Sequence, residues 1–275
     1  MKRILLFILI FITGISIQSY AQGNLLITPM RVVFEGNKQI EEFNLVNTGT
    51  DTTTFSISFL QYTMNEDGTL VKTENPDTLK MPAAPYLRIY PQQVTLAPGE
   101  PQVIMLQYRR KPTMPGEYRS HLYFRAEKDN SPPGTKKANT ETTSQLSIQL
   151  TAVYGLCIPI IIRTNEVKVS STLSDLELES TQASSQYLKF TINRSGNIST
   201  YGDIVVEHIP LQGKKVQIAV VRGVGVYTDI NKRKMVVKLN SKPGSPLSKG
   251  KMKVSYIAND VSNKPFLYAE GELGI

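Results

Sequence analysis

The sequence predicts an all-β protein built from two successive sandwich domains. Three observations support this fold class. Apolar and polar residues alternate with a period of two in many short runs, turn residues separate these runs, and no segment longer than ten residues has helical spacing of its apolar residues. The chain has 275 residues, which favours two domains. We therefore expect strands and their connections to position any functional residue.

The first segment, residues 1–21, has the pattern of a cleaved secretory signal. Lys2 and Arg3 precede an apolar run, and the small residues Ser19 and Ala21 occupy the positions expected before a cleavage site. The run is shorter than a typical membrane-spanning helix, and no second apolar run of this kind follows. We expect the mature chain to begin at residue 22, without a lipid-anchoring cysteine.

The composition excludes several classes of function. Cys157 is the single cysteine, and the two histidines, His121 and His208, lie in no ligand-spaced motif. We therefore expect no disulfide, no metal site and no cofactor. The sequence has no nucleophile elbow and no phosphate-binding loop, so we expect no enzyme activity. The formal net charge of +8 is interpreted as a mildly basic solvated surface, because no nucleic-acid-binding motif accompanies it.

The predicted strands follow one another along the whole mature chain. The clearest alternating runs have apolar residues at Phe55, Ile57 and Phe59, at Leu122 and Phe124, at Leu146, Ile148 and Leu150, and at Leu188, Phe190 and Ile192. Each run can place one face on a core and the other outward. Turn signals stand between the runs, at Gly36-Asn37, Asn47-Thr48-Gly49, Asp67-Gly68, Pro98-Gly99 and Pro115-Gly116. Many short strands with frequent turns favour sandwiches of the immunoglobulin type.

Two changes of composition indicate the domain organisation. Residues 128–143 contain almost no apolar side chains, which predicts a long loop between two strands. The apolar run from Leu156 to Ile162 ends at Arg163, and we place the domain boundary there. This gives an N-terminal domain of residues 22–163 and a C-terminal domain of residues 164–275, each an immunoglobulin-like sandwich.

Several motifs along the chain carry a resemblance to a known family. The first half contains Arg31-x-x-Phe34-x-Gly36, then Leu96-x-Pro98-Gly99, then the stretch from Gly116 to Leu122. The second half contains Tyr201-Gly202-Asp203-Ile204 and the stretch from Arg222 to Thr228. In this order the motifs resemble those of the PapD-like periplasmic chaperones of pilus and fimbria assembly. The likeness spans most of the mature chain and is stronger in the first domain.

The resemblance implies a fold and a function. It implies two immunoglobulin-like sandwiches in an L-shaped, or boomerang, arrangement with a binding cleft between them. It further implies a periplasmic chaperone that binds secreted pilin-like subunits by donor-strand complementation and delivers them to an outer-membrane usher. Whether the free protein caps itself as a dimer stays open. The alternative is an envelope structural or adhesive protein of two immunoglobulin-like modules, and a third hypothesis is a chaperone of the same fold for a client other than a pilus subunit.

Two groups of residues are candidates for binding the subunit. Leu146, Ile148 and Leu150 form an apolar comb directly after the predicted loop, and the resemblance favours them as donor-strand residues. The alternative is that they face the core of their own domain. The resemblance also implies that Arg31 binds the C-terminal carboxylate of the subunit, a task that suits a planar guanidinium. The alternative for Arg31 is a surface arginine whose stem lies on the sheet.

One position departs from the family pattern. The family has a donor-strand lysine that shares the carboxylate with the arginine, and its place falls here on Tyr154 or Gly155. Tyr154 is one candidate substitute, through a single neutral hydrogen bond. The alternatives are that Arg31 acts alone or that the second group is one of Arg109, Arg110 and Arg119.

Two further features have structural interpretations. Alternation places Arg119, His121, Tyr123 and Arg125 on one strand face, for which we expect solvent exposure. Cys157 is expected to be an inert buried thiol.

Overall fold

The computed structural model describes residues 25–74, 81–109, 112–127, 155–164, 166–180, 186–240, 247, 249–258 and 266–275. The strands of the first half are β1 (Leu25–Thr28), β2 (Val32–Phe34), β3 (Ile40–Asn47), β4 (Thr53–Leu60), β5 (Tyr62–Met64), β6 (Leu70–Lys72), β7 (Leu87–Tyr90), β8 (Gln93–Leu96), β9 (Pro101–Tyr108), β10 (Glu117–Ala126) and β11 (Gly155–Arg163). A short 3₁₀ turn, η2 (Ala84–Tyr86), precedes β7. The strands of the second half are β12 (Val169–Ser180), β13 (Gln186–Gly196), β14 (Thr200–Pro210), β15 (Val216–Val226), β16 (Lys232–Lys238), β17 (Gly250–Ala258) and β18 (Leu267–Gly274).

The first half forms a sandwich of two sheets. One sheet has the strand order β1-β3-β9-β7, and the other has the order β2-β11-β10-β4-β8. Their inner faces share one apolar cluster, in which Phe34, Phe43 and Phe124 are almost completely buried. The chain changes sheets between β1 and β2, because β1 pairs with β3 whereas β2 pairs with β11. Arg31 lies at this change, directly before β2.

The five-stranded sheet has two different faces, and β10 shows both. Its residues Tyr118, Leu122 and Phe124 point into the apolar core. Since successive side chains of a strand point to opposite faces, Glu117, Arg119 and His121 point away from that core, and all three are nonetheless buried. The polar face is therefore an interface rather than a solvated surface.

The second half forms another sandwich. Its sheets have the strand orders β12-β13-β16 and β15-β14-β17-β18. Their shared apolar cluster is separate from that of the first sandwich and includes Phe190, Val254 and Tyr256. Its strands are longer than the short strands that the sequence pattern suggested, since β12 has 12 residues and β13, β14 and β15 have 11 each.

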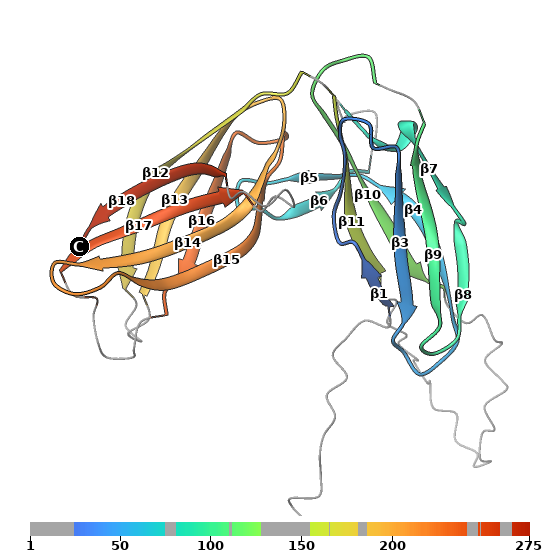
Figure 1. Ribbon diagram of the computed structural model, residues 1–275, viewed down its shortest axis with the longest axis horizontal. Helices are drawn as coiled ribbons and strands as arrows, with labels where there is room; N and C mark the ends of the chain where they lie inside the picture. Colours follow the sequence, from blue (N-terminus) through green and yellow to red (C-terminus); the bar gives the residue numbers. More distant parts are fainter. Residues whose placement is uncertain are drawn as a thin grey trace, which may run out of the picture.

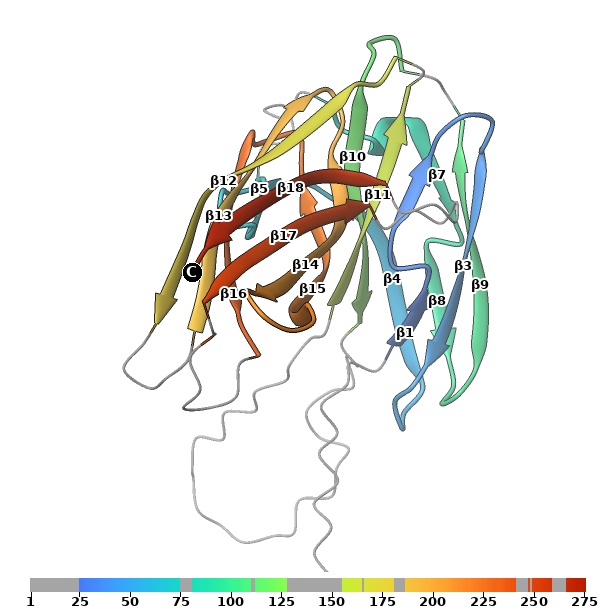
Figure 2. The same ribbon diagram turned by 60° about the vertical axis from the view of Figure 1, so that its left-hand side comes forward.

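The two sandwiches are tilted against each other and meet near the end of β11 (Figure 1). A hairpin of β5 and β6 extends from the first sandwich to the second (Figures 1 and 2). At its tip, the backbone N–H of Lys234 donates to the carbonyl oxygen of Glu66 at 2.6 Å, and Nζ of Lys234 lies 2.9 Å from Oε2 of Glu66. The hairpin is thus a second link between the domains, besides the chain itself.

The predicted fold class is confirmed. The structure is all-β, with two sandwiches in an angled arrangement, and the alternating runs at 55–59, 122–124 and 188–192 lie in strands with their apolar residues inward. The first sandwich ends with β11 at Arg163, and the second begins with β12 at Val169. The predicted secretory signal at 1–21, the predicted loop at 128–143 and the run at 146–150 lie outside the described residues.

Candidate functional site

The polar face of the five-stranded sheet meets the second domain. We use the term interdomain site for the side chains that gather there, which are Arg31, Glu117, Arg119, His121 and Arg163 from the first domain and Ser199, Tyr201, Tyr227 and Asp229 from the second. The first-domain residues are fixed by strand register, whereas the second-domain residues come from the start of β14 and from the turn after β15. Folding of both domains is needed to assemble this site.

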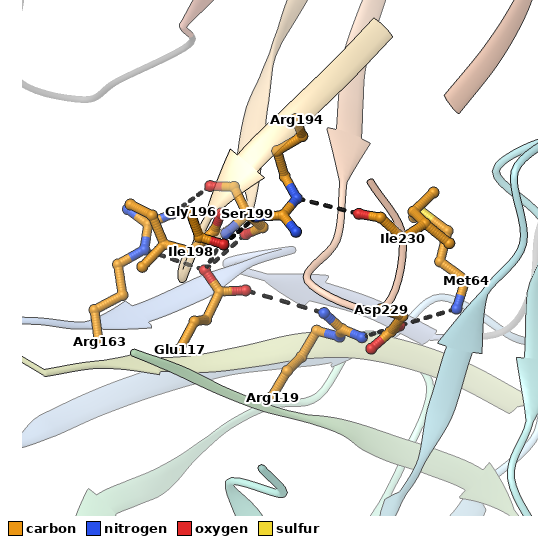
Figure 3. Close-up of polar contacts among 10 residues, drawn as sticks. All are labelled: Met64, Glu117, Arg119, Arg163, Arg194, Gly196, Ile198, Ser199, Asp229 and Ile230. Atoms are coloured by element: carbon orange, nitrogen blue, oxygen red, sulfur yellow. Dashed lines mark hydrogen bonds and ion pairs between the residues drawn. The ribbon is translucent and has the colours of Figure 1, made fainter. Parts of the chain in front are cut away.

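Glu117 is the anionic centre of one half of the site. Its side chain is completely buried, and Oε2 accepts hydrogen bonds from the backbone N–H of Ser199 at 3.0 Å and from its hydroxyl at 2.7 Å. Nε of Arg163 donates to the same oxygen at 3.3 Å, and Nη2 of Arg163 donates to the carbonyl oxygen of Ser199 at 3.2 Å (Figure 3). These contacts join the end of β11 to the start of β14. They compensate the cost of burying the Glu117 carboxylate.

Arg119 extends this paired half toward the hairpin. It forms an ion pair with Asp229, whose Oδ2 also accepts a hydrogen bond from the backbone N–H of Met64 at 3.0 Å (Figure 3). Its other terminal nitrogen, Nη1, lies 4.0 Å from Oε1 of Glu117. The guanidinium carbon lies 3.9 Å from the ring centroid of Tyr227, which is a cation–π geometry. Two carboxylates and one ring therefore hold the charge of Arg119.

Arg31 occupies the other half of the site and has a different environment. Its guanidinium carbon lies 4.2 Å from the ring centroid of Tyr201. Its Nη1 is buried and has no hydrogen-bond partner among the described residues, and none of the ion pairs found in that part of the chain includes Arg31. Burial lowers the pKa of Arg31, an effect that Tyr227 and Glu117 oppose. The side chain nevertheless stays charged, because arginine is not deprotonated in proteins.

His121 lies between these two arginines. It is 2% exposed, and neither ring nitrogen has a hydrogen-bond partner within the described segments. Its ring contacts Tyr62 edge-on, with a centroid distance of 4.9 Å, and lies 6.4 Å from the ring of Tyr227. Burial, and then the charges of Arg119 and Arg31, lower the pKa of His121 to about 4. The imidazole is therefore neutral at neutral pH.

The site thus combines charges that are ion-paired with one that is not. Within the paired set, Oε1 of Glu117 and Nη1 of Arg119 lie 4.0 Å apart and have no hydrogen bond among the described residues. Glu117 and Asp229 are matched by Arg163 and Arg119, whereas Arg31 forms no ion pair among the described residues and is influenced by the charge of Glu117 only at a distance. A buried cation without an anion is unfavourable. A planar guanidinium with an open donor can bind a carboxylate through parallel hydrogen bonds. The arrangement can therefore bind a small anionic group.

The sequence-predicted residues have different outcomes. Arg31 lies in the interdomain site, and Arg119 lies there too, although its charge is paired. Arg109 is exposed. The expectation that Arg119 and His121 lie on a solvated face is wrong, because the second domain covers that face; only Arg125, near the end of β10, is exposed. Arg110, Tyr154 and the comb of Leu146, Ile148 and Leu150 lie outside the described residues, and their roles stay predictions.

Strand register gives the β11 neighbour of Arg31. Val32 is level with Ile160, so that Arg31 comes level with Pro159, which has no side-chain donor. Gly155 lies four residues before Pro159, about 13 Å along the strand. A Cβ atom at Gly155 would come within 2.3 Å of the ring of Tyr123, so no side chain fits there without a shift. Register thus places no charged β11 side chain of the described part beside Arg31.

Sequence reasoning missed Glu117, Ser199, Tyr227 and Asp229 as interface residues. One signal was present, since Glu117 and Arg119 alternate with the core residues Tyr118 and Leu122 and must share a face. Alternation cannot tell whether the outer face of a strand meets water or another domain. Asp229 lies 110 positions after Arg119, so the pairing is a long-range contact that single-sequence patterns do not contain.

Cys157 also lies on this face of β11. It is half-buried rather than buried, and its sulfur lies 3.5 Å from the hydroxyl of Tyr62. This contact, followed by burial, raises the pKa of Tyr62 to about 12. The described residues contain no group of three histidine, cysteine or acidic residues that could hold a metal ion. They also contain no helix long and apolar enough to span a membrane.

Comparisons with known proteins give similarity to solved structures alone. No family model matches the sequence, and no curated protein matches it. The CupB2 chaperone of Pseudomonas aeruginosa is 11% identical with a TM-score of 0.46, over 91% of this chain and 100% of that chain. A chain of the CsuC–CsuE complex, a chaperone–tip adhesion subunit pre-assembly complex of Acinetobacter baumannii, is 12% identical with a TM-score of 0.44, over 90% and 99%. A chain of the SafA pilin–SafB chaperone complex of Salmonella enterica is 14% identical with a TM-score of 0.43, over 90% and 96%.

Proposed function

We propose that this chain is a non-enzymatic periplasmic chaperone that binds secreted pilus or fimbrial subunits and delivers them for assembly at the outer membrane. One observation carries the proposal. Arg31 has a buried guanidinium nitrogen without an acceptor in the described part of the chain, and it lies where the two domains meet. The C-terminal carboxylate of a subunit is a planar anion that can accept parallel hydrogen bonds from this guanidinium.

The surroundings of Arg31 support a binding role over a structural one. A structural arginine at a domain interface is held by acceptors of its own protein, as Arg119 is. Arg31 is instead supported from one side by the ring of Tyr201, which orients the guanidinium plane but accepts no charged hydrogen bond. Such an arrangement fixes the side chain before a ligand arrives, so less conformational entropy is lost on binding.

The second element of the proposal is strand donation. Leu146, Ile148 and Leu150 alternate with polar residues directly before β11 in the sequence. We propose that they fill apolar positions of a subunit whose sandwich lacks a strand, while backbone hydrogen bonds add affinity. The carboxylate anchor at Arg31 would fix the register of this pairing, because side chains alternate between faces and a shift of one residue exposes the wrong set.

A capture experiment tests the proposal. The tagged chain is isolated from the periplasm of its native cells, which must be producing secreted subunits, and the co-eluting proteins are measured by mass spectrometry. We expect one small secreted subunit at near-equal stoichiometry. Arg31→Ala should reduce its capture by roughly tenfold or more, because truncation leaves the partner charge without its counter-ion. Arg125→Ala is the matched control, since Arg125 is an exposed arginine at the end of the same sheet.

The strand element has its own variants. Ile148→Asp places a charge in the middle of the proposed comb and should abolish capture, whereas Gln149→Asp changes the opposite face and should leave it intact. Capture that survives Arg31→Ala and Ile148→Asp would contradict the proposal. A chain that elutes alone in every lane, from cells shown to be making subunits, would favour a structural envelope protein of two immunoglobulin-like modules.

A further inference from the structure

The side chains around Arg31 present more open hydrogen-bonding positions than one arginine provides. Among the described residues, the buried nitrogens without a partner in this region are Nη1 of Arg31, Nη1 of Arg119 and both ring nitrogens of His121. Nη1 of Arg119 lies 4.0 Å from Glu117 and belongs to the paired half of the site. His121 is different, because the described charges that act on it are those of Arg119 and Arg31, and because it is 2% exposed. An imidazole buried without any hydrogen bond is costly unless a ligand uses it.

Strand register places His121 in line with Arg31. His121 is opposite Pro159 on β11, and Arg31 directly precedes Val32, the partner of Ile160. The two residues therefore lie in one row, with a single strand between them, and their backbones are about 10 Å apart. Pro159 contributes no donor to this row. A long arginine side chain and an imidazole can both reach an anion bound above Pro159.

We propose that His121 is the second donor to the subunit carboxylate held by Arg31, and that at acidic pH it takes up a proton when this carboxylate binds. This inference rests on the proposed function of the site. The neighbours of His121 explain the proton uptake. Arg119 on its own strand and Arg31 before β2 disfavour a charged imidazole. The other titratable side chains in ring contact with it are Tyr62 and Tyr227, whose pKa values are both raised and which are therefore neutral at neutral pH.

A bound carboxylate changes this balance. It neutralises the charge of Arg31 and adds an acceptor for an imidazolium N–H, so the charged form of His121 becomes more favourable. The pKa of His121 then rises from its free value of about 4. Because the bound state holds the extra proton, affinity increases as the pH falls through the pKa of the bound state. For a rise of about one unit, affinity is about threefold higher at about pH 4.5 than at about pH 7.5.

The test follows the histidine rings by NMR during a pH titration. The chain has only two histidines, His121 and His208, so two ring signals are expected from protein prepared without a histidine tag. The probe is an acetylated tripeptide, Val-Leu-Val, with a free C-terminal carboxylate, and its C-terminal amide is the control. We expect the free acid to raise the pKa of His121 by about one unit and the amide to leave it unchanged. The signal of His208 should not respond to either peptide.

Affinities of the variants complete the experiment. His121→Gln should bind the free acid without pH dependence between about pH 4.5 and pH 7.5, whereas His208→Gln should keep the wild-type dependence. The wild-type titration needs no substitution at position 121, so it decides the question even if His121→Gln does not fold. Binding that requires Arg31 and the free carboxylate but leaves the pKa of His121 unchanged overturns this inference alone. Equal affinity for acid and amide, or no binding at about 10 mM peptide, overturns the carboxylate anchor and this inference with it.

Discussion

Two arginines at the same domain interface have opposite electrostatic environments. Arg119 and Arg31 both belong to the first domain, and both lie over a tyrosine of the second, at 3.9 Å from Tyr227 and 4.2 Å from Tyr201. Arg119 pairs with Asp229 and approaches Glu117, whereas Arg31 has no anionic partner within the described segments. Stacking on a ring is therefore common to both, and the carboxylates are what distinguish them.

The difference separates a residue that holds the domains together from one that can bind a partner. A buried charge that is matched by carboxylates of its own protein helps to hold the folded state together. Its removal leaves those carboxylates buried without a matching cation, which lowers the stability. A buried charge without such a match lowers stability until a ligand supplies the anion. The interface thus contains a paired half, around Glu117 and Arg119, and an open half, around Arg31 and His121.

The largest effect is expected for Arg119→Ala. Removing this side chain leaves Asp229 without a cation at a covered interface and leaves Glu117 with Arg163 alone, and we expect the free energy of unfolding to fall by about 3–5 kcal/mol. Urea unfolding followed by circular dichroism measures this change, with Arg125→Ala, on the same strand but exposed, expected within about 0.5 kcal/mol of wild type. If Arg119→Ala lowered the free energy of unfolding no more than Arg125→Ala does, the paired half of the interface would not stabilise the protein.

A double-mutant cycle sharpens this prediction. Arg119→Ala, Asp229→Ala and the double variant should give a coupling energy of roughly 2–3 kcal/mol, because the two side chains are in direct contact and little exposed. The matched cycle uses Glu66 and Lys234, whose side chains are 53% and 70% exposed and lie 2.9 Å apart. That pair should couple by less than about 1 kcal/mol. Equal coupling in both cycles would show that burial does not strengthen the Arg119–Asp229 pair.

In the open half, the buried His121 should make the free energy of unfolding depend on pH. Because the pKa of folded His121 is about 4 and that of the unfolded residue about 6.5, the unfolded state binds the proton more readily. The neutral imidazole therefore contributes stability that is fully present above about pH 6.5 and is lost as the pH falls toward 4. Between about pH 7 and pH 4.5, wild type should lose about 2 kcal/mol more than His121→Gln. Parallel stability curves for the two proteins would contradict a depressed pKa at His121.

The comparison also shows which parts of the structure the sequence could predict. Alternating residues such as Phe55, Ile57 and Leu122 identified strands and their core faces, because a period of two is a local property of a strand. Glycine-containing turns identified the connections for the same reason. At Gly68, in the β5–β6 hairpin, φ is +86°, a conformation that glycine adopts readily. The fold class thus follows from local patterns.

The interdomain site follows from local patterns only in part. The motif that contains Arg31 indicated one anchor, but burial of Glu117 and His121 depends on a second domain that packs on their face. Tyr201 contacts Arg31, and Tyr227 and Asp229 contact Arg119, each across more than 100 positions of the sequence. No periodicity encodes such contacts. From sequence alone, polar residues on the outer face of a strand are therefore compatible with exposure to solvent and with contact to another domain.

The smallest effect on stability is expected for Arg31→Ala, and this variant decides between the two halves most directly. The substitution removes a cation–π contact of about 0.5–2 kcal/mol with Tyr201. It also removes the cost of burying a charge without an anion, which acts in the opposite direction. The free energy of unfolding should therefore stay within about 1 kcal/mol of wild type, in the same urea experiment that detects the loss in Arg119→Ala. A loss of about 3 kcal/mol or more would mean that Arg31, like Arg119, holds the domains together; near-wild-type stability combined with lost subunit capture would assign its charge to the ligand.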